Sequence, residues 1–469
     1  MTTDETIDVL CAKCLCHRCV GEDYLRTEIK AKGKRRKCSY CGITTNSYEV
    51  GDVAKCFEIA FDQHYVRILD QPNPYWWDHD GKPVILAIMD AADIPQDAAE
   101  DIQLILKETY ADSEAAEMGY ETEFADDTYY EKIRANDHIW QENWRAFEDD
   151  LKTKARFFSR TASAYLACVF HGIERLSTSD GRPLVVEAGP GTAYPAFFRA
   201  RVFQSGKLLE EALCRPDIEL GPPPAHLANA GRMNASGIAV FYGANDPAVA
   251  IAEVRPPVGS KVMVARFDIL RPLRLLDLAA LNLVSIRGSI FDPKFADDLE
   301  HIEFLRTLCQ RITRPVMPND EVLDYLPTQA VADFLATEAK QPLDGILFPS
   351  VQAAGNAVNC VLFHKATRVE ALDIPAGTEI SVSTGENSED GWEVEFSVIE
   401  QVPLQPESEN EISSVSFLYR DMEHSRRHAG FDDCQLTLRL VTDTVAVHIV
   451  QSVQVKTVDF PVARRRLVK

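Results

Sequence analysis

The spacing of apolar residues changes near the middle of the chain. Between residues 51 and about 180, apolar side chains recur at three- and four-residue steps, the period of a helix with one buried face. The clearest such segments are residues 90–106, 128–147 and 155–176. This acidic part of the chain is therefore predicted to be mainly helical.

Beyond residue 197 the chain changes to short apolar runs that predict strands, interrupted by three helical segments. The predicted helices cover residues 247–254, 295–311 and 327–339. The predicted strands cover residues 200–203, 238–242, 261–269, 345–348, 360–363 and 369–372. This mixture predicts an α+β fold with a mixed or antiparallel sheet.

A chain of 469 residues is too long for one ordinary core. We predict four segments: a cysteine-rich module over 1–50, a helical domain over 51–180, an α+β domain over 195–375 and a β-rich extension over 376–469. The extension carries predicted strands at 379–383, 392–399, 435–441 and 445–455. Residues 181–195 are predicted to form a linker with one short strand.

The net charge of −23 argues against a general binder of nucleic acid or of anionic membranes. The first residues lack the basic and apolar segments of a secretory signal, and no apolar stretch is long enough to span a bilayer. We therefore expect a soluble cytoplasmic protein with no membrane partner, in which anion-binding groups are concentrated in one pocket.

Six of the twelve cysteines fall between residues 11 and 41. Cys16-x2-Cys19 and Cys38-x2-Cys41 have the spacing of a zinc ribbon, because each pair places two thiolates on one tight turn. The pair Cys11-x2-Cys14 lies just upstream and competes for the same metal. A structural zinc ion is predicted, and the choice between the two upstream pairs stays open.

Two further polar patterns are weaker. The basic run over residues 30–37 can contact nucleic acid, although such runs are more often a solvated face. Arg134 and His138 lie four residues apart on a predicted helix, as in some helical ribonucleases, but surface charges explain them more simply. Gly189-Pro-Gly191 lacks the third glycine and the Lys-Ser/Thr ending of a phosphate loop.

Three residues of different chemistry lie within residues 231–255. Arg232 lies in a turn-like Gly-Arg-Met-Asn, Tyr242 ends an apolar run, and Glu253 lies in a helical run rich in Ala, Val and Ile. A cation, a phenol and a carboxylate on adjoining elements suit a site that grips a phosphorylated, positively charged nucleotide.

Two other segments carry candidate site residues. Arg199 and Arg201 point to the same face of a predicted strand, and buried guanidiniums require an anion such as a diphosphate. Pairing with the many carboxylates of this acidic chain is the simpler alternative. Ser350 ends an apolar strand and precedes a loop with Gly355, Asn356 and Asn359, which places a hydroxyl at a sheet edge or is an ordinary turn.

These segments together resemble the RES domain. The resemblance covers residues 195–372 and rests on FFRARVF, GRMNASGIAVFY, AVAIAEVR, DGILFPSV and GNAVNCVLF. Met233 stands where the family more often has Trp. Upstream, Cys16-x2-Cys19, GEDYLRTEI and CSYCG resemble the HEPN/RES N-terminal domain.

The resemblance implies a fold related to ADP-ribosyltransferases and an enzyme that consumes NAD, as do the toxins of some toxin–antitoxin pairs. By position, the implied catalytic residues are Arg232, Tyr242, Glu253 and Ser350. The implied substrate-binding residues are Arg199, Arg201, Asn234 and Asn356. Glu253 would stabilise positive charge as the nicotinamide–ribose bond breaks.

Three functions follow as alternatives. The first is degradation of NAD by water or phosphate, the second is transfer of ADP-ribose to a macromolecule, and the third is non-catalytic binding of nucleic acid or a protein through the zinc module. The expected partners are NAD and, beyond it, phosphate, an antitoxin or regulatory protein, and a second copy of the chain.

Overall fold

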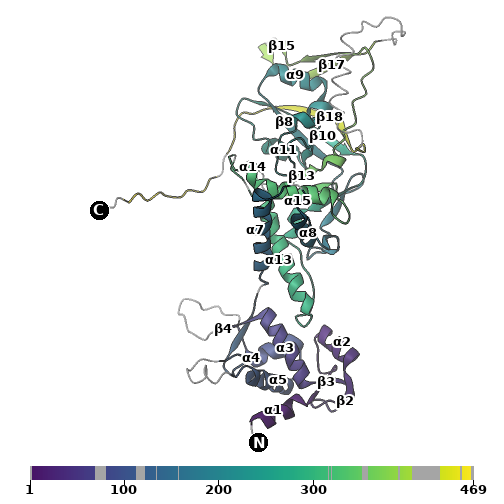
Figure 1. The fold of residues 1–469 in the computed structure, drawn as a ribbon. Helices are drawn as coiled ribbons and strands as arrows, with labels where there is room; N and C mark the ends of the chain where they lie inside the picture. Colours follow the sequence, from purple (N-terminus) through teal and green to yellow (C-terminus); the bar gives the residue numbers. More distant parts are fainter. Residues whose placement is uncertain are drawn as a thin grey trace. The chain divides into compact units, whose positions relative to one another are not determined.

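The computed structural model divides the chain into two units, which are described separately (Figure 1). The first comprises residues 1–144 and 285–307, and the second comprises residues 145–284 and 308–469. The structure describes residues 3–68, 81–111, 122–133, 135–156, 158–314, 316–317, 319–350, 357–388, 391–403, 434–454 and 457–465.

The first unit combines helices with two three-stranded sheets, ordered β1-β3-β2 and β4-β6-β5. Its helices are α1 (Thr3–Cys11), α2 (Asp23–Lys32), α3 (Val50–His64), α4 (Val84–Ala92) and α5 (Gln96–Thr109). Its strands are β1 (Cys14–Cys16), β2 (Lys34–Lys37), β3 (Thr44–Glu49), β4 (Tyr65–Ile68), β5 (Lys82–Pro83) and β6 (Tyr129–Lys132).

The core of the first unit is built from two distant parts of the sequence. Ile290 and Phe291 are buried in the same apolar cluster as Phe57 of α3. The rings of Phe57 and Phe291 meet edge to face, with their centroids 5.0 Å apart. The first unit is therefore discontinuous in sequence.

The second unit is organised around a sheet of eight strands in the order β18-β10-β8-β9-β13-β12-β11-β7. Its strands are β7 (Val185–Ala188), β8 (Ala196–Phe203), β9 (Phe241–Ala244), β10 (Lys261–Ile269), β11 (Leu273–Asp277), β12 (Gly345–Pro349), β13 (Val358–Leu362) and β18 (Leu438–Ile449). Within it, β11 and β12 run parallel and the other neighbouring pairs run antiparallel. The α+β prediction with a mixed sheet is confirmed.

Helices cover both faces of this sheet. One core cluster joins β8 to α9 (Gly206–Cys214), and a second joins β8 to α11 (Pro247–Glu253). The other helices of the second unit are α8 (Arg160–Val169), α10 (Pro216–Glu219), α12 (Leu278–Leu281), α14 (Glu321–Asp324) and α15 (Leu326–Thr337), with short 3-10 turns at Ile173–Arg175, Ala225–Leu227 and His364–Ala366. Helices α7 (His138–Thr153) and α13 (Pro293–Thr313) each have residues in both units. Two further hairpins are β14 (Glu379–Ser383) with β17 (Ser397–Gln401), and β15 (Glu386–Ser388) with β16 (Gly391–Glu393).

The sheet is weakly joined between β8 and β9. Strands β8 and β10 pair along eight successive positions, whereas β8 and β9 share the single pair Phe198↔Ala244. Gly243 lies next to this junction, and a Cβ there would come within 2.8 Å of the Phe241 ring and 3.0 Å of Phe197. Glycine therefore permits the close approach of the two strands at their one shared pair, beyond which the backbones separate.

Three helix predictions are partly wrong. The segment 90–106 contains the end of α4 and most of α5, because Asp93 adopts a left-handed φ of 48° and Ile94 precedes Pro95, which disfavours helix. The segment 128–147 begins with strand β6 rather than helix, since its aromatic residues favour a pleated strand. The helix predicted over 155–176 is limited to α8 and a 3-10 turn.

Strand predictions were closer. The runs at 200–203, 261–269, 345–348 and 360–363 correspond to β8, β10, β12 and β13, and the predicted strand in 181–195 is β7. The strand expected at 238–242 begins only at Phe241, and 369–372 makes one bridge, Val369↔Leu438. The two strands predicted at 435–441 and 445–455 form one strand, β18, and β11 was not predicted.

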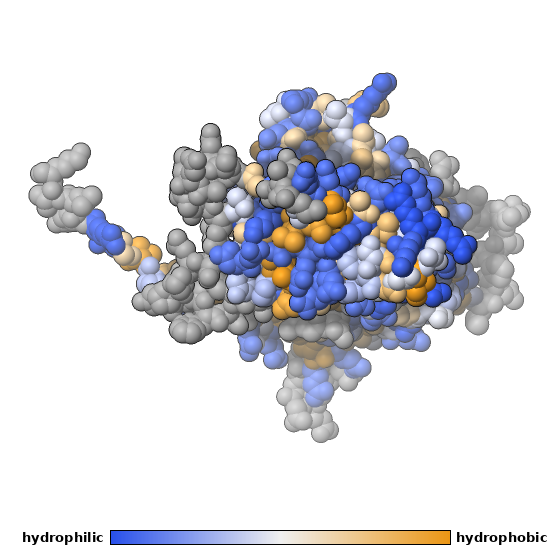
Figure 2. Space-filling view, turned by 90° about the horizontal axis from the view of Figure 1, so that it is seen from below, coloured by the Kyte–Doolittle hydropathy of each residue, from blue (hydrophilic) through white to orange (hydrophobic). Residues whose placement is uncertain are grey.

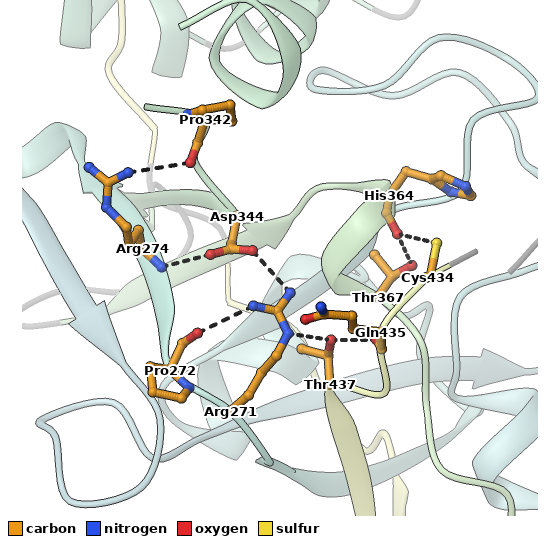
Figure 3. A network of polar contacts seen from close by, with 10 residues as sticks. All are labelled: Arg271, Pro272, Arg274, Pro342, Asp344, His364, Thr367, Cys434, Gln435 and Thr437. Atoms are coloured by element: carbon orange, nitrogen blue, oxygen red, sulfur yellow. Dashed lines mark hydrogen bonds and ion pairs between the residues drawn. The ribbon is translucent and has the colours of Figure 1, made fainter. Parts of the chain in front are cut away.

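A polar network ties the start of β18 to the rest of the second unit (Figure 3). Arg271 donates to the carboxylate of Asp344 at 3.0 Å and to the hydroxyl of Thr437 at 3.3 Å. Asp344 also accepts the backbone N–H of Arg274 at 2.9 Å. These contacts hold the segment before β18 against the start of β12. Asp344 therefore has a structural role, and it lies at the other end of β12 from Ser350.

The described helices include none that is both long and apolar enough to cross a membrane. The face seen in Figure 2 is mostly hydrophilic, with hydrophobic residues in small groups.

Candidate functional site

Glu253 is the last residue of the short helix α11. The helix begins where the sequence predicts a turn: Asp246 caps it by accepting the N–H of Ala248 at 2.8 Å, and Pro247 fits the first helical position. Val249 and Ala250 bury the helix against β8, which brings the carboxylate of Glu253 to the junction of β8 and β9.

One oxygen of Glu253 is held by two donors from neighbouring strands. The hydroxyl of Ser350 donates to Oε1 at 2.6 Å, and Nδ2 of Asn359 donates to the same atom at 2.8 Å. Ser350 follows β12 directly, and its N–H bonds the carbonyl of Ala357, so the antiparallel pair β12–β13 aims both side chains at α11. The second oxygen, Oε2, makes no hydrogen bond within the described part of the chain.

A pocket of about 250 Å³ opens at this point. It lies where β8 and β9 separate, and α11 forms one wall. Its lining residues are Phe198, Arg199, Ala200, Tyr242, Gly243, Ala244, Ala250, Glu253, Val254, Phe348 and Asn359. This volume is small beside the roughly 300–1,000 Å³ of typical ligand pockets, so it fits one end of an extended ligand.

Arg199 supplies a cation to the pocket. Its guanidinium lies 5.1 Å from the centre of the Phe241 ring, and its buried Nη1 has no hydrogen-bond partner among the residues that the structure describes. Burial, with a smaller contribution from the charge of Arg201, lowers the pKa of Arg199 to about 10. A buried guanidinium donor without an acceptor is costly, and an anionic ligand would satisfy it.

Arg201 has a different environment. It lies on the same face of β8 as Arg199, as the strand period predicts, but it forms an ion pair with Glu219 of α10 and lies 5.2 Å from the Phe203 ring centre. It does not line the pocket. The alternative of pairing with a carboxylate therefore describes Arg201, whereas no described carboxylate pairs with Arg199.

The side chain of Tyr242 is held by hydrogen bonds to the turn at residues 231–234. Its hydroxyl donates to Oδ1 of Asn234 at 3.0 Å and accepts the N–H of Met233 at 3.2 Å. A Cβ on Gly231 would lie 2.6 Å from Asn234 Oδ1 and 2.7 Å from the Tyr242 hydroxyl, so this turn requires glycine. Burial raises the pKa of Tyr242 to about 12, against the opposing effects of the Met233 N–H and of Arg232 and Arg199.

Asn234 and Met233 support this arrangement from inside the protein. Asn234 is 4% exposed, and its Nδ2 donates to the carbonyls of Asn229 and Ile238 at 2.9 and 3.0 Å. Met233 is also buried. Neither residue lines the pocket, so both shape the turn that holds Tyr242.

Arg232 lies beside the pocket rather than in its lining. Its Nη1 donates to the carbonyl of Ile312 near the end of α13 at 2.7 Å, and its guanidinium lies 5.3 Å from the Tyr325 ring centre. The positive charge of Arg232 is one of the effects that oppose the rise in the pKa of Tyr242. The structure thus brings together Arg199, Tyr242, Glu253 and Ser350, with Arg232 at the margin.

Two predicted residues fall outside what the structure describes, and one residue of the site was missed. Asn356 and Arg134 are not among the described residues, and His138 is exposed near Glu142. The sequence predicts Asn359 in a loop, whereas it lies on β13 and is 4% exposed. The available signal was a single amide in the apolar run Val-Asn-Cys-Val-Leu.

The first unit contains a cluster of four cysteines. The sulfurs of Cys16, Cys19, Cys38 and Cys41 all lie within 4.8 Å of one another, and three of their separations are 3.6, 3.7 and 3.8 Å. A tetrahedral zinc ion with Zn–S bonds of about 2.3 Å requires sulfurs about 3.8 Å apart, so these residues can hold zinc. Although burial opposes it, backbone N–H groups of Cys41, Tyr40 and Cys16 lower the pKa of Cys38 to about 7.

The upstream cysteines have other surroundings. Cys14 begins β1 and lies near the carbonyl of Ala12, and Cys11 packs against Gly51. Tyr40, between Cys38 and Cys41, donates to Asp101 of α5 at 2.7 Å, and Lys13 donates to the same carboxylate. The four-cysteine cluster is thereby tied to the helices of the first unit.

The geometry defines a pocket with an oriented carboxylate and an arginine whose buried Nη1 has no acceptor among the described residues. Residues 215–384 match the family model of the RES domain, which supports the RES family for this segment. The match includes Tyr242, Glu253, Ser350 and Asn359 and leaves Arg199 and the zinc module outside. It links the chain only coarsely to functions that act on NAD. Searches of curated proteins and of solved structures gave no match.

Proposed function

We propose that the second unit cleaves the nicotinamide–ribose bond of NAD, as a glycohydrolase or a phosphorylase. The observation that carries this proposal is the pairing of Glu253 and Arg199 in one pocket. Among the residues that the structure describes, one oxygen of Glu253 is held by two donors and the other has none, and a buried donor of Arg199 has no acceptor. NAD presents a carbon that becomes positive and a diphosphate, which complement these two groups.

The chemistry follows from the charges. When the bond between nicotinamide and C1′ breaks, its electron pair stays with the nicotinamide nitrogen, which becomes neutral, and positive charge develops on the ribose. Oε2 of Glu253 stabilises that charge electrostatically. Water then bonds to C1′ and gives ADP-ribose with release of a proton, or phosphate bonds to C1′ and gives ADP-ribose phosphorylated at that carbon. Neutral nicotinamide leaves without a general acid.

The other residues position these groups. Ser350 and Asn359 orient the carboxylate, Arg199 binds the diphosphate, and Tyr242 contacts the ribose side of the pocket. Arg232 is proposed to attract the anionic ligand from the margin. In this scheme zinc has a structural role in the first unit, because its cysteine ligands belong to that unit. An ADP-ribosyltransferase-like fold and a toxin's role restrained by an antitoxin remain part of the same proposal.

The test is chromatography of purified protein incubated with NAD, with and without phosphate. Release of nicotinamide supports the proposal, and the companion product distinguishes water from phosphate as the acceptor. Adenine-labelled NAD distinguishes a transferase, because label would then appear in a macromolecule. Intact NAD under all conditions contradicts the proposal.

A second candidate function, binding of nucleic acid by the first unit, is favoured by one observation. Arg35 and Lys37 of the edge strand β2 are cross-strand neighbours of Asn46 and Thr44, with no carboxylate among these four residues. Arg36, which alternates to the other face, is paired with Glu49. Replacing Arg35 and Lys37 by Ala should weaken binding of a labelled duplex and flatten its salt dependence, with a slope change of about 2. Unchanged affinity contradicts this candidate.

A further inference from the structure

The two polar atoms of the Asn359 side chain, Nδ2 and Oδ1, have different surroundings. Its Nδ2 donates to Glu253 Oε1 at 2.8 Å, while its buried Oδ1 has no hydrogen-bond partner in the described segments. This orientation is fixed by chemistry, because an ionised carboxylate only accepts hydrogen bonds and must therefore face the NH2 group. Oδ1 then points away from Glu253.

The residue that carries this buried oxygen lines the pocket. Asn359 is 4% exposed and lies among the lining residues, between Phe348 on β12 and Ala244 on β9 in the sheet register. The neighbouring side chains on β13 are apolar or a thiol, so packing alone does not call for an amide at this position. A buried carbonyl without a donor is destabilising, and a ligand that supplies an O–H or N–H would relieve it.

We infer that Oδ1 of Asn359 accepts a hydrogen bond from the 3′-hydroxyl of the ribose whose C1′ is attacked. This inference rests on the proposed cleavage of NAD. Glu253 must lie near C1′ to stabilise its charge, so its free Oε2 meets the adjacent 2′-hydroxyl. The neighbouring 3′-hydroxyl then lies toward Oδ1 of Asn359, because Nδ2 of the same amide is bonded to Glu253. The pair selects an intact ribose diol.

The experiment compares NAD with an analogue that lacks the 3′-hydroxyl of the nicotinamide ribose. In the wild-type protein, kcat/KM should fall roughly 10- to 100-fold with the analogue, as expected when a buried acceptor loses its donor. In Asn359→Ala most of that preference should disappear, because the acceptor is absent for both substrates.

Ser350→Ala is the matched control. It removes the other donor to the same oxygen of Glu253, so it should slow both substrates equally and keep the preference. If Asn359→Ala also keeps the full preference, Asn359 only positions Glu253 and the inference is wrong.

Binding separates this inference from the proposed reaction. In a Glu253→Gln background, calorimetry should show NAD binding more tightly than the analogue, and adding Asn359→Ala should remove that difference. This comparison needs no turnover, so it decides the inference even if wild-type protein leaves NAD intact. Equal affinity for both dinucleotides, or no affinity for either, overturns it.

Discussion

Ser350 and Glu253 are 97 positions apart in the sequence, yet the serine hydroxyl donates to the glutamate carboxylate at 2.6 Å. Two adjoining strands and one short helix create this contact. The helix is fixed by its cap at Asp246, and Ser350 by its backbone bond to Ala357. The carboxylate therefore has a defined direction before any ligand arrives, which is the preorganisation that electrostatic catalysis requires.

Glu253→Gln should lower the rate of nicotinamide release about 100- to 1,000-fold, because the amide keeps the shape of the side chain and loses its charge. Thermal unfolding should change little. Glu211→Gln is a suitable control, since Glu211 is an exposed residue of α9. Equal rates for the wild-type and Glu253→Gln proteins would exclude Glu253 as the catalytic carboxylate.

Arg199→Met should stabilise the protein and inactivate it. Burial disfavours the charged form of Arg199 and lowers its pKa to about 10, and its buried Nη1 has no hydrogen-bond acceptor among the described residues. Removing it should raise the free energy of unfolding by about 1–2 kcal/mol while NAD binding is lost. Arg201→Met, which breaks an ion pair at the protein surface, should have a much smaller effect on binding. Denaturant titration and calorimetry measure both quantities.

Tyr242→Phe should cost about 1–3 kcal/mol of stability, because Met233 N–H and Asn234 Oδ1 lose a partner. The pKa of Tyr242 is raised to about 12 in the folded protein, so the folded state holds this proton more tightly than the unfolded state. The corresponding stability is complete below pH 10 and is lost as the pH rises from about 10 to about 12. Denaturation at several pH values should show a smaller alkaline loss in the variant. An identical loss would contradict the burial of this hydroxyl.

Gly231→Ala should displace Tyr242, since the added methyl would meet both Asn234 and the Tyr242 hydroxyl at under 3 Å. We expect lower stability and a drop in NAD turnover. Gly206→Ala makes the same chemical change at the first residue of α9, where a Cβ meets nothing within 4 Å, and should be neutral. Similar behaviour of the two variants in thermal unfolding and turnover assays would show that the Gly231 turn is not tight.

Elemental analysis of the purified protein should find about one zinc ion per chain. Cys16→Ser and Cys38→Ser should lose most of it, whereas Cys11→Ser and Cys14→Ser should retain it, because only the former pair belongs to the four-sulfur cluster. Structural zinc sites supply folding free energy, so chelation should also reduce the helical signal of the first unit. Loss of zinc from the Cys14→Ser protein would indicate a different ligand set.

The sequence predicts the residues of the site more reliably than it predicts the contacts that these residues make. The order of Tyr242, Glu253 and Ser350 singled them out, and the structure brings them together. Arg199 and Arg201 could not be separated, because a strand places residues two apart on one face. The distinction depends on Glu219, a neighbour from another element.

The same limit applied elsewhere. Cysteine spacing could not choose between the Cys11–Cys14 and Cys16–Cys19 pairs, because each pair has two intervening residues. In the structure Cys11 ends α1, and the sulfurs of Cys16 and Cys19 are the ones that lie with those of Cys38 and Cys41. Asn359 was overlooked because its significance depends on Glu253, which is 106 positions away. The apolar residues of segment 90–106 keep a helical period through Asp93, so their spacing does not predict the turn at that residue.

The discontinuity of the first unit has a consequence for synthesis of the protein. Phe57 can contact Phe291 only after the ribosome has translated residues 145–284, which belong to the second unit. At about 5–20 residues per second, the nascent N-terminal segment waits on the order of 10 s with this part of its core uncovered. During that interval the unfinished aromatic cluster is open to chaperones and to aggregation, so slower translation between residues 145 and 285 should reduce the yield of folded protein.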